Sequence, residues 1–181
     1  MTLKPRPDRD APAAKESAVT DKITPCLWYD LGQARAAAEF YMSLGLPDSR
    51  IDAVHASPAD NPSTPEGAEM MVEFTLAGRA FLGLNGGSEF PQTEAVSFLI
   101  RTDDQAETDR LWNAIVGNGG RESVCGWCKD RWGVNWQITP RRLMEFYTDP
   151  DPARTRAAFQ AMLTMKKIDI AALEAAADAA G

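Results

Sequence analysis

One stretch near the N-terminus decides how this chain is expected to fold. Residues 23–44, ITPCLWYDLGQARAAAEFYMSL, begin with a short apolar run that ends at an Asp-Leu-Gly turn, as a β-strand does. The apolar residues that follow fall on one stripe at helical spacing, and these are Ala34, Ala37, Ala38, Tyr41 and Leu44. Gly45 ends that pattern. The stretch therefore predicts a strand followed by an amphipathic helix.

Three further strand patterns follow the predicted helix. They lie at residues 51–56, 69–76 and 79–84, with a proline-containing loop at 57–67 and a turn at Gly78. The predicted order of this first unit is β-α-β-β-β.

The same order returns in the second half of the chain. A strand is predicted at residues 95–101, and Thr102 is the candidate N-cap of a helix, with Gln105 completing a capping box. Short strands are then predicted near residues 122–124, 126–129 and 134–139. The sequence thus contains an internal repeat, which indicates an architecture of two similar modules.

The repeat defines the expected fold class. In each β-α-β-β-β unit the helix covers one face of the sheet, and the other face must find a partner. We expect an α+β fold with modules at residues 21–88 and 93–139, whose sheets, from one chain or two, enclose a cleft. Residues 140–181 are expected to be helical, with N-caps at Asp151 and Asp169.

Composition excludes several classes of protein. The formal net charge is -7 and the isoelectric point about 4.8, which argues against binding to nucleic acid or to an anionic membrane surface. No apolar run approaches the roughly 20 residues that span a bilayer. Residues 1–20 lack the apolar core of a secretory signal and are expected to form a solvated tail, the alternative being a strap on a partner subunit.

The three cysteines indicate a reducing compartment. An odd number without a signal sequence favours the cytoplasm. Cys125 and Cys128 form a CxxC pattern, and we interpret them as two cysteines packed in a hairpin. The alternatives are a redox pair, which usually opens a helix, or a structural zinc site, for which only Cys26 and His55 remain as ligands.

Several short segments resemble a known group of proteins. They are PCLWYD at 25–30, EFY at 39–41, LNGG at 84–87, CGW at 125–127, WQ at 136–137, DPDP at 149–152 and MKKID at 165–169. With the repeated units, they make the chain similar, over about residues 22–178, to the vicinal oxygen chelate superfamily. That superfamily includes glyoxalase I, extradiol dioxygenases and antibiotic resistance proteins. The closer resemblance is to its PhnB-like group, which carries the label "3-demethylubiquinone-9 3-methyltransferase". The resemblance implies a glyoxalase/bleomycin resistance-like fold.

The resemblance also implies where a metal would be bound in metal-using members. Their ligands come from the first and last strands of each module, which here means positions near Thr24, Ala95, Gln137 and either Gly83 or Asn85. A catalytic divalent site normally has three protein ligands, and this chain has a single histidine. We therefore expect no bound metal and no cofactor.

The cleft is nevertheless expected to bind a small molecule, aromatic in kind. Strand alternation places Cys26 and Trp28 on one face of the first strand, and it places Ser97, Leu99 and Arg101 on the equivalent face of the fifth. The other expected ligand-binding residues come from the later strands and are Asn85, Trp127 and Gln137. Aromatic walls with a few polar groups are typical of such pockets. The alternative is that the tryptophans are core residues.

Three functions remain open at this level. The first is a cytoplasmic, metal-free small-molecule binding protein that forms a homodimer. The second is a lyase or dioxygenase with a degenerate or shared metal site that uses Gln137. The third is a methyltransferase, as the group label states. The glycine clusters at 85–87 and 117–120 favour tight turns over a cofactor loop, because the first is not followed by a helix pattern and the second ends a helix. No catalytic residue is assigned.

Overall fold

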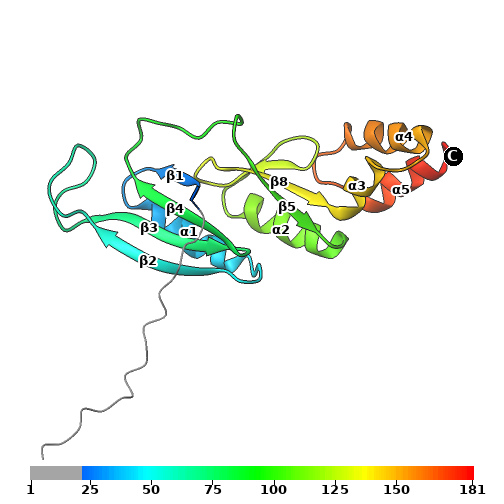
Figure 1. Ribbon diagram of the computed structural model, residues 1–181. Helices are drawn as coiled ribbons and strands as arrows, with labels where there is room; N and C mark the ends of the chain where they lie inside the picture. The colour runs from blue at the N-terminus through cyan, green and yellow to red at the C-terminus, as the bar shows by residue number, and fades with distance from the viewer. Residues whose placement is uncertain (1–21) are drawn as a thin grey trace, which may run out of the picture.

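The computed structural model describes residues 22–181, so the predicted tail at 1–20 lies outside the described residues (Figure 1). The first module consists of β1 (Cys26–Tyr29), α1 (Gln33–Ser43), β2 (Arg50–Ala56), β3 (Glu69–Leu76) and β4 (Arg79–Asn85). Its strands form one sheet in the order β1-β4-β3-β2. β1 runs parallel to β4, and the other neighbours are antiparallel.

The second module repeats this plan. It consists of β5 (Phe98–Thr102), α2 (Gln105–Gly117), β6 (Arg121–Glu122), β7 (Trp127–Lys129) and β8 (Asn135–Pro140). The sheet order is β5-β8-β7-β6, and the first strand again runs parallel to the last. The predicted α+β fold of two βαβββ modules is confirmed.

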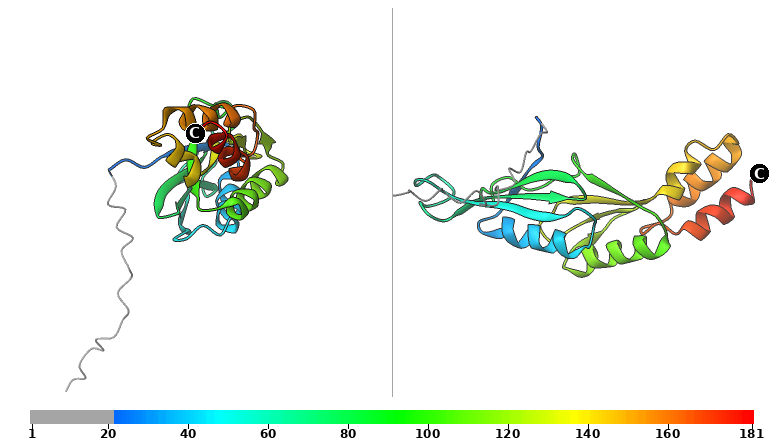
Figure 2. Two further views of the ribbon diagram at one scale, coloured as in Figure 1. Left: turned by 90° about the vertical axis from the view of Figure 1, so that its right-hand side faces the viewer. Right: turned by 60° about the horizontal axis from the view of Figure 1, so that its bottom comes forward.

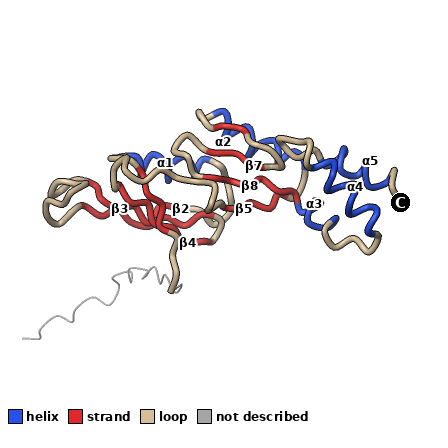
Figure 3. Tube along the Cα trace, turned by 90° about the horizontal axis from the view of Figure 1, so that it is seen from above, coloured by secondary structure: helices blue, strands red, loops and turns tan. Residues whose placement is uncertain are grey.

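Each module covers one face of its sheet with its own helix. α1 packs against the strands of the first sheet and α2 against those of the second, and both helices lie on the same side of the molecule (Figures 2 and 3). Leu27 and Tyr29 of β1 are buried on the helix side, whereas Cys26 points the other way and is exposed. This is the alternation of an extended strand. We call the side turned away from α1 and α2 the open face of each sheet.

One hydrophobic core spans both modules. The phenyl rings of Phe81 in β4 and Phe98 in β5 lie edge to face, with their centroids 5.1 Å apart. The ring of Tyr41 in α1 contacts Trp136 in β8 at 5.3 Å. Small domains bury too little apolar surface to be stable alone, and a shared core relieves that shortage. The two modules are therefore packed as one body.

The C-terminal segment forms three helices at one end of the molecule. They are α3 (Arg141–Phe146), α4 (Pro152–Met162) and α5 (Ile170–Asp178), and the N-caps expected at Asp151 and Asp169 belong to α4 and α5. The predicted caps are confirmed, because Asp151 accepts a hydrogen bond from the backbone of Ala153 and Asp169 accepts one from Ala172. None of the helices within residues 22–181 has the length and apolar character needed to cross a membrane.

The predicted cap of the second helix is wrong. Thr102 is the last residue of β5, and its hydroxyl is hydrogen-bonded to that of Thr108 at 2.6 Å. The N-cap is Asp104, whose Oδ1 accepts from the backbone N–H of Glu107 at 2.8 Å. Gln105 instead joins α2 to the C-terminal segment, since its amide bonds the carbonyl of Ile168. The strand expected near 122–124 also lies earlier, at Arg121–Glu122.

Candidate functional site

The open face of the second sheet brings together most of the residues expected to bind a ligand. Leu99 in β5 is the register partner of Gln137 in β8, and Gln137 is the partner of Trp127 in β7. These three side chains therefore form one row across three neighbouring strands. Leu99 is 37% exposed and the other two are half-buried. The row combines two apolar groups with a central amide.

Two further polar groups flank this row. The Nε2 of Gln137 donates to the hydroxyl of Ser97 at 2.8 Å, which fixes the orientation of the amide. Arg101 lies two residues beyond Leu99 on the same face and is exposed. A guanidinium in that position can bind a carboxylate or phosphate through two parallel hydrogen bonds. A pocket of about 220 Å³ lies farther along this face, and Trp127 and Lys129 are among its lining residues.

The open face of the first sheet has a different character. Cys26 and Leu82 are register partners on it, as are Trp28 and Leu84. Leu82, Leu84 and Trp28 are half-buried, so this face presents apolar side chains to its surroundings. Trp28 marks one end of the face, where its ring meets that of Phe90 edge to face at 4.9 Å.

A pocket of about 340 Å³ lies on the open face of the first sheet. Its lining combines apolar groups with two carboxylates and consists of Thr24, Asp52, Glu73, Phe74, Ala80, Phe81 and Leu82. The Nε of Arg50 donates to Asp52 at 2.7 Å. The single histidine of the chain, His55, lies beside the pocket in β2 with its Nε2 2.9 Å from Glu73 Oε1. Sequence reasoning did not assign the two carboxylates to a site.

Asn85 lies away from both open faces. It is 1% exposed, and its Oδ1 accepts from the backbone N–H of Ala34 in the first turn of α1 at 2.9 Å. Its Nδ2 donates to the carbonyl of Glu69 at 3.0 Å. The side chain therefore joins α1 to the sheet, and its amide is fully engaged in the fold.

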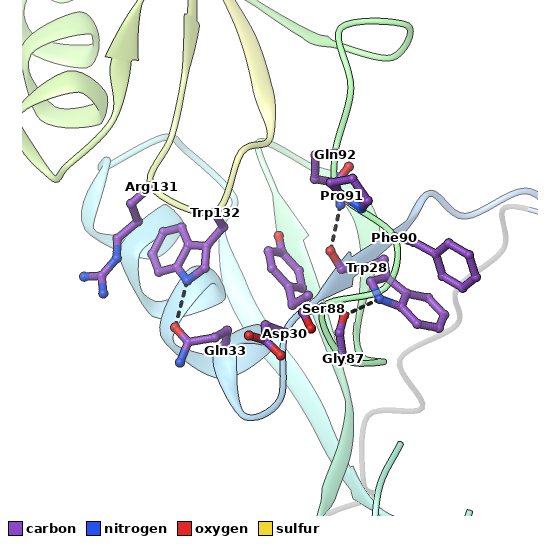
Figure 4. Close-up of a pocket in the computed structure, with 11 residues that line it drawn as sticks. Trp28, Asp30, Gln33, Gly87, Ser88, Phe90, Pro91, Gln92, Arg131 and Trp132 are labelled. Carbon is purple, nitrogen blue, oxygen red and sulfur yellow. Dashed lines mark hydrogen bonds between the residues drawn. The ribbon is translucent and has the colours of Figure 1, made fainter. Parts of the chain in front are cut away.

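A third pocket, of about 310 Å³, lies where the two modules meet (Figure 4). Trp132 of the β7–β8 loop faces residues at the end of β1, at the start of α1 and in the segment that links the modules, whereas the side chain of Arg131 extends away beyond the Trp132 ring. We call it the junction pocket, and it is lined by Trp28, Tyr29, Asp30, Gln33, Gly87, Ser88, Phe90, Pro91, Gln92, Arg131 and Trp132. Only Trp28 of this set was expected to bind a ligand.

A buried carboxylate lies behind the junction pocket. Asp130 is 3% exposed, and its Oδ2 accepts from the hydroxyl of Tyr41 at 2.7 Å and from Nε1 of Trp136 at 3.0 Å. Its Oδ1 accepts from the backbone N–H groups of Trp132 and Val134. Burial raises the pKa of Asp130 above its ordinary value, although these four donors act against the rise. The carboxyl joins α1 of the first module to the hairpin of the second.

The two cysteines of the CxxC pattern lie in different environments. Cys128 is 1% exposed on the helix side of β7, and burial raises the pKa of its thiol to about 12. Cys125 lies in the preceding loop, half-buried against the C-terminal helices. Reactive redox cysteines are accessible and have lowered pKa values. Cys128 is buried and its pKa is raised, which disfavours a redox role.

This difference predicts the thiol chemistry of the native protein. At pH 8 an aromatic disulfide reagent should modify the exposed Cys26 within minutes, whereas Cys128 should react only after unfolding, because its thiolate fraction is very small. The Cys26→Ser variant is the matched control and should lose the fast phase. Rapid modification of Cys128 in the folded chain would contradict the structure.

The residues present do not fit a three-ligand metal site. Within residues 22–181, His, Cys, Asp and Glu side chains do not gather in any group of three or more that could hold an ion. At the positions implied by the resemblance, Asn85 uses its amide in the fold and Gln137 is bonded to Ser97. His55 pairs with Glu73 in the other module.

Comparison with known proteins identifies the family. Residues 21–139 match the family model described as 3-demethylubiquinone-9 3-methyltransferase, which is more than half of the chain. The chain therefore belongs to that family, and the match ends before α3, α4 and α5. No curated protein matches it.

Solved structures support the fold. The chain is similar to the PhnB protein from Bacillus cereus, with 26% identity and a TM-score of 0.58 over 66% of this chain and 99% of that one. It is also similar to protein PA1353 from Pseudomonas aeruginosa, with 21% identity and a TM-score of 0.51 over 65% and 96%. The matches agree with the PhnB-like group to which the sequence segments pointed.

Proposed function

We propose that this protein binds a small aromatic molecule on the open faces of its βαβββ sheets and does so without a metal. The observation that carries the proposal is the row of Leu99, Gln137 and Trp127 on a sheet face that α2 leaves uncovered. An aromatic ring and an aliphatic group with one oriented amide between them are the usual make-up of a ligand pocket. Among the implied ligand positions, the engaged Oδ1 of the Asn85 side chain supports binding without a metal.

The proposal includes a homodimer. Covering the half-buried apolar side chains of an open sheet face with a second layer removes them from water and so stabilises the assembly. A second copy of the chain would supply that layer and would close the cleft around the ligand. Sedimentation equilibrium tests this part of the proposal, and a chain that stays monomeric at high micromolar concentration and with ligand bound contradicts it.

A thermal-shift screen separates this function from its alternatives. Ligand at 100 times its Kd adds about 2.7 kcal/mol to the free energy of unfolding. For a chain of this size that raises Tm by roughly 5–10 °C. We expect such shifts with planar aromatic compounds. Shifts with zinc, nickel or manganese alone would favour a lyase or dioxygenase, and shifts with S-adenosylmethionine would favour the methyltransferase named in the family description.

Arg101 predicts a preference for anionic ligands. The Arg101→Ala variant should bind an aromatic carboxylate about tenfold more weakly, because a hydrogen bond to a charged group contributes about 1.5–3 kcal/mol. It should bind the corresponding neutral amide as tightly as the original protein. Arg156→Ala, an exposed arginine on α4, is the matched control and should change neither affinity. Equal affinities of the Arg101 variant and the original protein for the carboxylate would contradict this role.

A further inference from the structure

The pocket on the open face of the first sheet carries a charge that indicates a class of ligand. Its volume of about 340 Å³ is within the range of small-molecule sites, and its lining contains the carboxylates of Asp52 and Glu73 and no basic side chain. We infer that this pocket binds an arylalkylamine, with the ligand ammonium at the carboxylates and the ring against the apolar lining. The inference rests on the proposed function, because it names the class of aromatic ligand that this face prefers.

A β-bulge brings the two carboxylates to the same face of the sheet. The register of β2 against β3 shifts between residues 51 and 53, so Asp52 is an extra residue in β2. In a regular strand residues 52 and 55 would point to opposite faces. Here Oδ2 of Asp52 accepts from Oγ1 of Thr75 at 2.7 Å, whereas His55 bonds Glu73, and residues 73 and 75 share one face of β3. The carboxylates of Asp52 and Glu73 therefore converge on the pocket from neighbouring strands.

The positive charge beside the pocket does not balance these carboxylates. The guanidinium of Arg50 bonds Asp52 through Nε at 2.7 Å and Asp48 through Nη1 at 2.9 Å, so one cation serves two acids. The partner of Glu73 is His55, at 2.9 Å, and a neutral imidazole leaves the charge of that carboxylate uncompensated. A ligand ammonium would supply the missing positive charge.

The two carboxylates differ in how accessible they are. The side chain of Asp52 is 9% exposed, and its two oxygens accept hydrogen bonds from Arg50 and Thr75. The side chain of Glu73 is 40% exposed, and within residues 22–181 its hydrogen bond is the one at Oε1 with His55. Oε2 of Glu73 is therefore the acceptor for a ligand ammonium. Asp52 adds negative charge from a position where water screens it little.

The remaining lining suits an aromatic body. Ala80 is the register partner of Thr75, and Leu82 is that of Glu73, so two apolar side chains lie directly beside the polar groups. The small side chain at position 80 leaves room for a ring next to the carboxylates. Apart from Thr24, the rest of the lining is apolar as well. A ligand whose ring and ammonium are a short chain apart would contact both parts of the pocket.

Two probes of the same shape test the charge. 2-Phenylethylamine carries an ammonium at neutral pH, and 2-phenylethanol has a neutral hydroxyl in its place. Titrations of the full chain followed by NMR should give a Kd for the amine about tenfold lower than for the alcohol, because a hydrogen bond between charged groups contributes more than a neutral one. Amine binding no tighter than alcohol binding overturns the inference and leaves the proposed function standing. If neither probe binds saturably the inference is also wrong, and the screen with larger planar compounds decides the proposed function separately.

Charge-removing variants locate the binding. Glu73→Gln should raise the Kd of the amine about tenfold, to that of the alcohol, and leave the alcohol unchanged. Asp52→Asn should weaken the amine in the same direction, and circular dichroism checks that both variants fold. Glu145→Gln is the matched control, since Glu145 is an exposed glutamate paired with Arg142 in α3, and it should change neither Kd. Amine binding that Glu73→Gln and Asp52→Asn both leave unchanged would lie elsewhere and overturn the inference.

Discussion

Replacing Asp130 by alanine is expected to lower the free energy of unfolding by about 4 kcal/mol, because the change leaves buried hydrogen-bond donors without an acceptor. The hydroxyl of Tyr41, the indole N–H of Trp136 and two backbone N–H groups all donate to this carboxylate. Urea unfolding followed by circular dichroism measures the loss. Asp103→Ala is the matched control, since Asp103 is an exposed aspartate paired with Arg141, and it should change stability by less than about 1 kcal/mol.

The hydrogen bond between Tyr41 and Asp130 joins the two modules, so the two residues should be energetically coupled. Tyr41 belongs to α1 and Asp130 to the β7–β8 loop, 89 residues apart in sequence. The effects of Tyr41→Phe and Asp130→Ala should therefore be clearly non-additive in a double-mutant cycle, by more than about 0.5 kcal/mol. A loss below about 1 kcal/mol for Asp130→Ala, or strictly additive effects, would contradict the role of this carboxylate in joining the modules.

The same group predicts a pH dependence. Burial raises the pKa of Asp130 above its ordinary value of 3.8, so the folded chain keeps a proton that the unfolded chain has lost. The contribution of Asp130 to the free energy of unfolding should then fall as pH rises from about 4 and level off once the folded-state carboxyl has ionised. The stability of the original protein minus that of Asp130→Asn isolates this effect and should decrease over that range. A difference that increases with pH would contradict the raised pKa.

Gly120→Ala is expected to destabilise the second module by about 3 kcal/mol. A Cβ at this position would lie 2.4 Å from the carbonyl oxygens of both Ile115 and Lys129. Backbone atoms on two sides cannot rotate away as a side chain can, so the turn after α2 would have to shift. Chemical denaturation measures the cost.

Gly117 provides the matched control for that substitution. It is the last residue of α2, and no atom lies within 4 Å of the position that its Cβ would take. Gly117→Ala should leave stability unchanged or raise it by up to about 1 kcal/mol, because alanine favours helix more than glycine does. Equal effects of the two substitutions would show that the close backbone approach at Gly120 carries no cost.

The fold was predictable because its pattern is local and repeated. The alternation of Leu27 and Tyr29 with Cys26 and Trp28 is present in the sequence, and so is the alanine stripe of α1. The wrong N-cap shows the limit of that approach. Thr102 and Asp104 both have capping side chains, and only the tertiary position of Thr102 at the end of β5 decides between them.

The candidate sites were predictable only in part. Strand alternation places Leu99 and Gln137 together on the open face of the second sheet, as the structure does, and the same alternation in β3 would have indicated Glu73. The junction pocket has no such signal, since Gln33 and Trp132 meet across 99 residues of sequence. Asn85 was expected to bind a ligand, but its side chain instead bonds the backbone of α1. The residue type alone does not reveal that contact.

The most direct test of the central claim is an isothermal titration of chelator-treated protein with the best aromatic compound from the screen. We expect one ligand per chain, the same Kd with and without chelator, and binding about fivefold weaker in Gln137→Ala, as the loss of one neutral hydrogen bond implies. Trp127→Ala should weaken binding further. Binding that requires an added divalent metal, or that neither substitution changes, would contradict a metal-free site on the open face.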